Sequence, residues 1–376
     1  MAEPLKNLLD AVAVRAAGRH LQRANPGFER ERFEALALAG LDDLEFKARA
    51  HRIADALAQT LPSDFASAVD VLLAGLAPPL RDDQSDVSPA GDAGLSGWIV
   101  WPLTEFVARH GLDEPQRALA ALHAMTQRFT AEFALRPFVE RHPRLVFETL
   151  AHWTRDPSAL VRRLVSEGTR PRLPWGKQLK SLIADPSPTL PLLAALQDDP
   201  SETVRRSVAN HLNDIAKDHP ALVAEWIAGH LPGAGPERRA LLKHASRTLI
   251  KRGDRRLLAL WGVGAPLRGS ASLTVTPRRI RVGDSLRLAV TVASRSAKPQ
   301  DLVIDYALHF VGARGATSRK VFKGWTLSLA ARETRELAKR HSLRPITTRT
   351  YYPGVHRVEL LVNGRTAADA SFTLRA

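Results

Sequence analysis

Acidic side chains that share helical faces with arginines are the residues of this sequence best suited to chemistry. In three successive segments the basic and acidic residues are spaced by multiples of four: Arg128 and Glu132, Arg163 and Glu167, and Arg206, Asn210 and Asp214. This spacing brings side chains onto one face of a helix. Each segment is therefore predicted to place a helical carboxylate in one shared concavity. There the carboxylate could orient a reactant or accept a proton from it.

The alternative for each pair is a solvated ion pair, which stabilises a helix by roughly a few tenths of a kcal/mol. Two observations favour function. Glu132 lies between Phe129 and Phe133, an apolar setting that is unusual for a solvated pair. Asp214 is followed by two apolar residues and so lies close to a packed helical face.

A repeated phrase predicts the elements that would position these carboxylates. It begins at intervals of 43 residues: Asp113-Glu-Pro, Asp156-Pro-Ser-Ala-Leu-Val-Arg-Arg and Asp199-Pro-Ser-Glu-Thr-Val-Arg-Arg. A spacing near this value is typical of HEAT or armadillo arrays of paired helices, whose concave surfaces hold large ligands. Asp156 and Asp199 are each predicted to cap a helix that begins with proline. The last repeat has an apolar stripe of Val204, Val208, Leu212 and Ile215.

The connection after Glu167 is the most unusual segment: Glu167-Gly-Thr-Arg-Pro-Arg-Leu-Pro-Trp175-Gly. Two prolines stiffen it, so Arg170, Arg172 and Trp175 are predicted to be held outward at low entropic cost. Guanidinium groups and an indole on a stiff loop suit contacts with phosphates and bases. The alternative is a loop that packs its tryptophan into the next repeat, and the residues alone do not decide between the two.

Charge is distributed unevenly along the chain. Residues 266–376 contain 20 Lys and Arg against 7 Asp and Glu, a net charge of +13, and residues 237–256 have a net charge of +6. Residues 1–236 have a net charge of −4. A basic block joined to a nearly neutral scaffold is the electrostatic signature of binding to an extended polyanion such as a phosphate backbone. A proteome generally rich in arginine would not explain this asymmetry.

The periodicity of apolar residues changes once along the chain. Residues 1–80 and 98–261 are predicted to be helical, and residues 81–97 form a polar, glycine-rich loop. After residue 266 the pattern alternates, and about seven short strands with an Asn363-Gly364 hairpin turn are predicted. The expected fold is mostly α: a HEAT-like helical-repeat solenoid (1–262) followed by an immunoglobulin-like β-sandwich (267–376) without its disulfide.

Several classes of protein are excluded or disfavoured. No stretch approaches the roughly 18 apolar residues of a membrane span, and no signal peptide is recognisable at the N-terminus. The chain has no cysteine, which is consistent with a reducing cytoplasm. It has no Gly-rich phosphate loop, no His-Glu-x-x-His and no Gly-x-Ser-x-Gly. Its 13 histidines lack ligand spacing, so neither a metal nor a cofactor is expected.

The chain resembles the AlkC-type DNA alkylation-repair glycosylases, which are relatives of the AlkD-type HEAT-repeat glycosylases. Three phrases carry the resemblance: Thr130-Ala-Glu-Phe-Ala-Leu-Arg-Pro-Phe138, Ser166-Glu-Gly-Thr-Arg-Pro-Arg-Leu-Pro-Trp175 and Ser207-Val-Ala-Asn-His-Leu-Asn-Asp-Ile-Ala-Lys-Asp218. The segment from Arg344 to Gly354 and the strand-rich C-terminal part extend it. The C-terminal immunoglobulin-like domain separates AlkC-type from AlkD-type members of the family.

The resemblance implies excision of cationic 3-methyladenine and 3-methylcytosine from duplex DNA. It makes Glu132, Glu167 and Asp214 the active-site carboxylates and Trp175 the aromatic residue near the lesion. Carboxylates can stabilise the oxocarbenium character of the breaking sugar–base bond and position water. A monofunctional hydrolysis is expected, with the base not flipped from the duplex. Phosphate contacts are expected from Arg163, Arg170, Arg172 and Arg206 and from residues 238–256, and Asn210 is expected to contact DNA.

Two rival functions remain at this stage. One is a non-catalytic HEAT scaffold that binds a protein partner, and the other is a protein that binds damaged DNA without chemistry. Under the glycosylase interpretation the partner is double-stranded DNA with alkylated bases, and the expected form is a monomer. The expected place is the bacterial cytoplasm, associated with the nucleoid.

Overall fold

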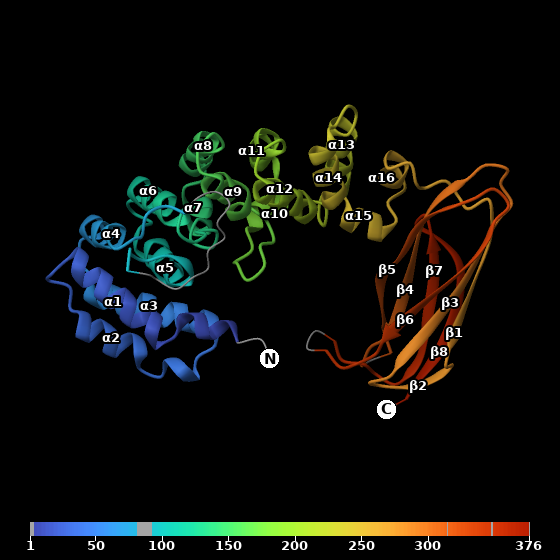
Figure 1. Cartoon of the computed structure of the whole chain (residues 1–376), viewed down its shortest axis with the longest axis horizontal. Helices are drawn as coiled ribbons and strands as arrows, with labels where there is room; N and C mark the ends of the chain where they lie inside the picture. Colours follow the sequence, from blue (N-terminus) through green and yellow to red (C-terminus); the bar gives the residue numbers. More distant parts are fainter. Residues whose placement is uncertain (1–3, 81–91, 314, 347–348, 376) are drawn as a thin grey trace. The chain divides into compact units, whose positions relative to one another are not determined.

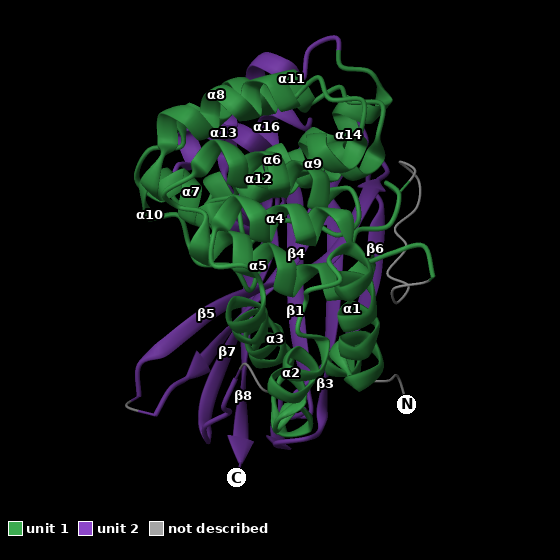
Figure 2. Cartoon of the chain, turned by 90° about the vertical axis from the view of Figure 1, so that its left-hand side faces the viewer, with its two compact units in different colours: residues 1–218, 234–245 green, residues 219–233, 246–376 purple. Residues whose placement is uncertain are grey.

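The computed structural model describes residues 4–80, 92–313, 315–346 and 349–375 (Figure 1). The chain divides into two compact units (Figure 2). The first unit contains residues 1–218 and 234–245, and the second contains residues 219–233 and 246–376. Part of the loop predicted at 81–97 lies outside the described residues. The domain boundary predicted at residue 262 stays a prediction.

The first unit is helical, as the apolar periodicity predicts. Its elements, with η for 3₁₀-helices, are η1 (Leu5–Leu9), α1 (Ala11–Ala24), α2 (Arg30–Leu38), η2 (Leu41–Asp43), α3 (Phe46–Thr60), α4 (Phe65–Ala74), η3 (Gly97–Ile99), α5 (Val100–His110), α6 (Pro115–Thr126), α7 (Arg136–Arg141), α8 (Pro143–Trp153), α9 (Ala159–Gly168), α10 (Lys180–Ala184), η4 (Ser187–Thr189), α11 (Leu190–Leu196), α12 (Glu202–Ile215) and α14 (Pro236–Ala245). Among the described residues, no helix is both long and apolar enough to cross a membrane.

Consecutive helices pack as neighbours in the region of the repeated phrase. Helix α8 contacts α9, α11 contacts α12, and α9 lies against both α11 and α12. The predicted apolar stripe of α12 faces this packing, since Val204, Val208, Leu212 and Ile215 are all completely buried. Burial of such side chains contributes about 1.5–3 kcal/mol each. This packing of the apolar stripe fixes the direction in which the polar face of α12 points.

The prediction that Asp156 and Asp199 cap helices is wrong by two residues. Helices α9 and α12 have Ser158 and Ser201 at their N-cap positions. Proline disfavours helical backbone in the residue before it, and the Asp156 and Asp199 carboxylates each accept a bond from the backbone N–H two residues later. The helices therefore begin after this turn.

The repeated aspartates connect neighbouring repeats instead. Asp156 lies 2.7 Å from His123 of α6, and Asp199 accepts two hydrogen bonds from Arg162 of α9, at 2.6 and 3.0 Å. Arg162 also donates to the carbonyls of residues 156 and 157, and Arg205, at the same repeat position, donates to those of residues 199 and 200. The residues of the repeated phrase thus form the hydrogen bonds that connect neighbouring repeats.

In its described part, the second unit contains three helices and the strands. The helices are α13 (Pro220–His230), α15 (Arg247–Arg252) and α16 (Arg255–Leu260). The strands are β1 (Gly269–Thr276), β2 (Arg279–Arg281), β3 (Ser285–Ser294), β4 (Gln300–Val311), β5 (Thr317–Leu329), β6 (Thr334–Ser342), β7 (Gly354–Val362) and β8 (Arg365–Arg375). They form two sheets of order β1-β3-β6 and β2-β8-β7-β4-β5. All neighbouring pairs are antiparallel except β2 and β8.

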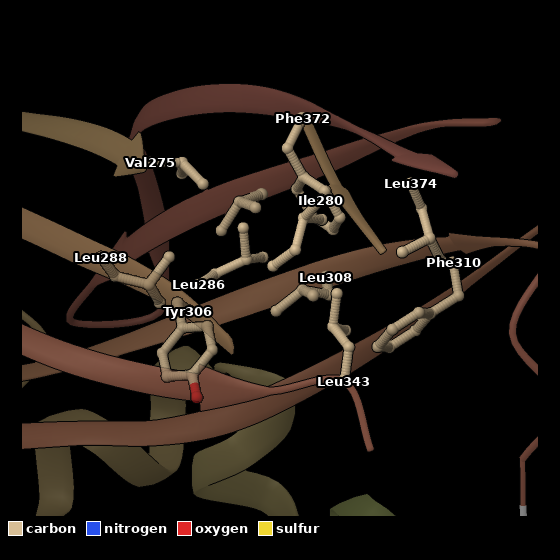
Figure 3. Close-up of a cluster of buried hydrophobic side chains, with 11 residues drawn as sticks. Val275, Ile280, Leu286, Leu288, Tyr306, Leu308, Phe310, Leu343, Phe372 and Leu374 are labelled. Carbon is tan, nitrogen blue, oxygen red and sulfur yellow. The ribbon is translucent and has the colours of Figure 1, made fainter. Parts of the chain in front are cut away.

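Alternating apolar residues from both sheets form the core of this unit. Leu286 and Leu288 of β3 meet Tyr306 and Leu308 of β4 in one buried cluster, which Figure 3 shows. The predicted hairpin turn is confirmed, because β7 and β8 pair on either side of residues 363 and 364 and both have positive φ. The sequence pattern does not predict strand β6, because charged residues occur on both of its faces and His341 is its one buried residue.

Candidate active site

The structure brings the three predicted carboxylates together in the first unit, although one of them is not on a helix. Glu167 lies in α9 and Asp214 near the end of α12. Glu132 lies in a turn between α6 and α7, so the predicted helical pair with Arg128 is wrong. Arg128 instead donates to the backbone carbonyls of residues 77 and 124. Helix α6 ends at Thr126 and α7 begins at Arg136, so Arg128 and Glu132 do not share a helix.

Two arginines join the carboxylates into a network of alternating charge. Arg163 Nη1 lies 3.0 Å from Glu132 Oε2, and Arg163 Nη2 lies 3.9 Å from Glu167 Oε1. Arg170 Nη1 donates to Glu167 Oε1 at 2.5 Å, and its Nη2 lies 2.8 Å from Asp214 Oδ2. Three carboxylates separated by up to 82 positions in sequence thus share two guanidinium groups.

Further donors fill the buried end of this network. Ser207 Oγ donates to Glu167 Oε2 at 2.5 Å, and Lys217 Nζ donates to Asp214 Oδ1 at 2.7 Å. At the other end, Thr130 Oγ1 donates to Glu132 Oε2 at 2.9 Å. No described residue donates a hydrogen bond to Glu132 Oε1. Glu132 is therefore the carboxylate with an oxygen that can accept a bond from water or substrate.

Burial and ion pairing have opposite effects on the pKa values of the groups at the centre of the network. Burial by itself would raise the pKa of Glu167, but the guanidinium groups of Arg163 and Arg170, with the bond from Ser207, hold this pKa below its ordinary value. Burial likewise works against the charge of Arg170, yet the Glu167 and Asp214 carboxylates raise its pKa. These groups therefore stay ionised at neutral pH inside the protein, which concentrates fixed charge at low dielectric.

The loop after Glu167 holds one of its three predicted side chains far outward. Trp175 is 61% exposed and has a φ of 63°. The prediction that Arg170 points outward is wrong, because its guanidinium is buried and paired with the carboxylates of Glu167 and Asp214. Arg172 is partly exposed and forms two hydrogen bonds of 2.8 Å with Asp218. The loop thus presents an indole to solvent and an arginine to the interior.

The other predicted contact residues differ in accessibility. Arg206 is exposed on α12 and pairs with Glu202 at 3.0 Å. Asn210 is half-buried, and its Oδ1 lies 3.0 Å from His244 Nε2. Arg163 is partly exposed but is bound within the network. Within the basic segment, Arg238 pairs with Asp198 and lies in α14. Arg206 therefore has the most exposed side chain of these three arginines.

Arg136 is a residue that the sequence analysis did not single out. Its side chain is only 1% exposed, and its guanidinium donates to the carbonyls of Gly168, Arg170 and Lys177 at 3.1, 2.8 and 2.5 Å. These carbonyls lie at both ends of the loop that carries Trp175. Its place within the phrase from Thr130 to Phe138 is the only signal in the sequence, and that signal does not specify a structural role.

Replacing Arg136 by methionine is expected to lower the free energy of unfolding by about 3 kcal/mol, because buried carbonyls would lose their donors. Urea denaturation measures this change. Arg141→Met is the matched control at the end of the same helix, where the side chain is largely exposed and its partner Asp113 lies 3.9 Å away. The control should change stability by less than about 0.5 kcal/mol. Equal effects of the two variants would contradict the assigned role of Arg136.

The imidazole side chain of His211 is completely buried next to the carboxylate network. Its Nδ1 donates to the carbonyl of Ser166 at 2.9 Å, and burial lowers its pKa to about 4. The unfolded chain binds a proton at the ordinary value of 6.5, whereas the folded chain does so only near 4. Stability from this residue is therefore constant above pH 6.5 and falls as the pH drops from 6.5 to about 4.

The variant His211→Asn is expected to remove this part of the pH dependence, since an asparagine amide can donate to the Ser166 carbonyl without titrating. The slope of unfolding free energy against pH between 6.5 and 4 should decrease, with an integrated difference of about 3 kcal/mol. Urea denaturation at several pH values tests this. The exposed His152 on α8 supplies the control, His152→Asn, which should keep the wild-type slope. An unchanged slope in His211→Asn would contradict the assignment.

Comparison with known proteins agrees with this architecture. A family model described as "DNA alkylation repair enzyme" matches residues 127–249, which include the whole carboxylate network. A second model, described as "Uncharacterised protein YhaZ, C-terminal Ig-like domain", matches residues 269–376. The class defined by the fold is therefore a DNA alkylation repair protein with an immunoglobulin-like C-terminal domain.

Two relatives that match the chain over its full length identify the class of protein more closely. The chain is 36% identical over 370 residues to "Uncharacterized protein YhaZ" of Bacillus subtilis (strain 168), with 98% of each chain covered. It is 35% identical to the solved structure of Pseudomonas fluorescens alkylpurine DNA glycosylase AlkC bound to DNA containing an abasic site analogue, with a TM-score of 0.88 and 100% of both chains covered. The chain belongs to the family of AlkC-type DNA alkylation-repair glycosylases, as its sequence motifs predict.

Proposed function

We propose that this protein is a monofunctional DNA glycosylase that hydrolyses the N-glycosidic bond of 3-methyladenine and 3-methylcytosine in duplex DNA. The paired helices of the first unit are HEAT-like repeats in this proposal. The observation that carries it is the alternating network in which Arg163 and Arg170 hold Glu132, Glu167 and Asp214 together. The solved glycosylase structure, to which the chain is similar over its whole length, supports the assignment.

The network suits the charge that develops in this reaction. Methylation at N3 makes the base cationic, so the base departs with the bonding electrons and needs no general acid. The deoxyribose then gains oxocarbenium character, which fixed carboxylates stabilise in a site of low dielectric. Water adds to the anomeric carbon and gives its proton to a carboxylate. The open Oε1 of Glu132 is assigned this proton, while Glu167 and Asp214 supply negative charge.

The proposed product is a free abasic site without strand cleavage. A lyase reaction needs an unprotonated amine that attacks the sugar, and Lys217, whose amine is placed at the network, donates to Asp214. In this proposal the lesion stays within the duplex, and Trp175 contacts it from the stiff loop. Arg172, Arg206, Asn210 and the basic segment 238–256 contact the backbone, and the +13 net charge of residues 266–376 adds phosphate contacts.

Release of free base from methylated duplex DNA tests the proposal. Wild-type protein should release 3-methyladenine or 3-methylcytosine, and Asp214→Asn should release them at least about 100-fold more slowly. The abasic product should remain uncleaved until alkali is added. Folded, DNA-binding wild type that releases no base would leave a damage-recognition protein, and failure to bind DNA would leave a scaffold. Nicked product without alkali would overturn the monofunctional assignment.

A further inference from the structure

The hydroxyl group of Thr130 makes three hydrogen bonds, and all of them involve Glu132 or its partner Arg163. Thr130 Oγ1 donates to Glu132 Oε2 at 2.9 Å. It accepts from the backbone N–H of Glu132 at 3.3 Å and from Arg163 Nη1 at 3.2 Å. A hydroxyl group has one donor and two acceptor positions. These bonds therefore use the full capacity of the Thr130 hydroxyl at a single carboxylate and its partner.

Glu132 depends on side-chain contacts for its orientation, because it does not lie on a helix. It lies between α6, which ends at Thr126, and α7, which begins at Arg136. A glutamate side chain that nothing holds samples many rotamers. Among the described residues, Thr130 and Arg163 donate to the Glu132 carboxylate, and both donate to Oε2. The orientation in which Oε1 stays open is therefore set by this pair.

Arg163 is able to bind Glu132 in a second way. Its hydrogen bonds to described residues come from Nη1, which donates to Thr130 Oγ1 and, at 3.0 Å, to Glu132 Oε2. Its Nη2 has only a longer contact, 3.9 Å from Glu167 Oε1. Guanidinium groups favour a carboxylate through two parallel bonds, one to each oxygen. Such a pair would occupy Oε1 of Glu132 and close the position that is proposed to accept a proton from water.

The Thr130 hydroxyl opposes this second arrangement. It donates to Oε2 and accepts from the same Nη1 that binds Oε2, so the guanidinium and the carboxylate meet at one oxygen. We infer that Thr130 is a positioning residue that keeps Oε1 of Glu132 from pairing with Arg163. The geometric part of this inference depends only on these contacts, whereas its effect on the reaction rate rests on the proposed function.

Replacing Thr130 by valine keeps the branched shape of the side chain and removes its hydroxyl. Single-turnover release of base from methylated duplex DNA should slow about tenfold, because one hydrogen bond to a charged group favours an orientation by about this factor. The affinity for the duplex should stay within about twofold of wild type, since no charge changes. Thr130→Ser restores the hydroxyl and should recover the rate to within about threefold of wild type.

Thr126 supplies the matched control in the same part of the chain. Its Oγ1 accepts a bond from the Ala131 backbone N–H at 3.4 Å, and no described carboxylate bonds to it. Thr126→Val makes the same chemical change and should keep the rate of the folded protein within about twofold of wild type. Equal losses of rate in Thr126→Val and Thr130→Val would overturn the inference, because a loosened turn would explain both.

Two double variants test whether Thr130 acts through Glu132 and Arg163. In the background of Glu132→Gln, Thr130→Val should cost less than about twofold in rate, because the carboxylate that Thr130 positions is absent. In the background of Arg163→Lys, it should cost less than about threefold, because an ammonium group cannot form the fork of two parallel bonds. A tenfold cost that persists in either background would overturn the inference.

A crystal structure of Thr130→Val separates this inference from the glycosylase function. Arg163 should lie within hydrogen-bond distance of both carboxylate oxygens of Glu132 in this variant. A Glu132 carboxylate that meets Arg163 through one oxygen and keeps Oε1 open would overturn the inference, whether or not the wild-type protein releases base. Absence of base release by wild type would overturn the proposed function instead, and the crystal structure would still decide the geometric inference.

Discussion

Replacing Glu132 by glutamine is expected to slow the single-turnover release of 3-methyladenine from duplex DNA by about 100-fold or more. Glu132 Oε2 is held by Thr130 and Arg163, whereas Oε1 accepts no bond from a described residue. The amide of glutamine can keep the bonds to Oε2, but it cannot take a proton from water or oppose the charge on the sugar. The affinity for methylated duplex should not weaken, because the change removes negative charge.

A matched control lies eight residues away. Glu140 of α7 pairs with Lys177 at 2.7 Å, and Glu140→Gln makes the same chemical change on the surface of the same region. It should leave the single-turnover rate within about twofold of wild type, as expected for an exposed pair. If Glu132→Gln released the base as fast as Glu140→Gln, Glu132 would be only a structural ion-pair partner.

Local patterns in the sequence predicted those features that depend on neighbouring residues. The apolar stripe from Val204 to Ile215 required a buried helical face, and Asn363-Gly364 required a turn with positive φ at both positions. Both are confirmed. The carboxylates could be selected because they share spacings in multiples of four with arginines, and Arg163 and Arg206 occupy the same position of the repeated phrase. Their spacing predicted which elements carry Glu167 and Asp214, although it predicted neither their burial nor their partners.

The wrong prediction for Arg170 and the omission of Arg136 have a shared physical origin. Arg170 was expected to face solvent because a proline-rich loop is normally exposed, but Glu167 and Asp214 provide a buried site that compensates its charge. Arg136 contacts carbonyls that lie 32 to 41 positions away. Charge pairing across repeats and caps for backbone carbonyls are tertiary interactions. A single sequence records the residues that take part in them but not their pairing.

Replacing Arg170 by glutamine is expected to lower the free energy of unfolding by about 3–5 kcal/mol at neutral pH, because it removes the shared partner of two buried carboxylates. Asp214 is only 1% exposed and would retain a single ion pair, with Lys217. Urea denaturation measures the loss. Arg172→Gln is the matched control on the same loop, since Arg172 makes a similar two-bond pair with Asp218 at a more exposed place. Its cost should be about 1 kcal/mol or less.

The sign of the pH dependence distinguishes this mechanism from a simple loss of packing. Without Arg170 the pKa of Glu167 rises in the folded state, because burial is no longer opposed by that guanidinium. The folded variant then binds a proton that the unfolded chain releases at its ordinary value of 4.5. Its deficit relative to wild type should therefore shrink as the pH falls from 7 towards 5. A deficit that is independent of pH would indicate lost packing instead.

The double variant Arg170→Gln, Glu167→Gln separates stability from catalysis. Removing the charge of Glu167 eliminates one of the two buried carboxylates left without their partner, so about half of the lost unfolding free energy should return. The rate of base release should not return, because the double variant has lost negative charge that the reaction requires. Recovery of both quantities would mean that the network only maintains the fold. Recovery of stability alone would show that the same buried charges that cost stability when unpaired are those that act on the sugar.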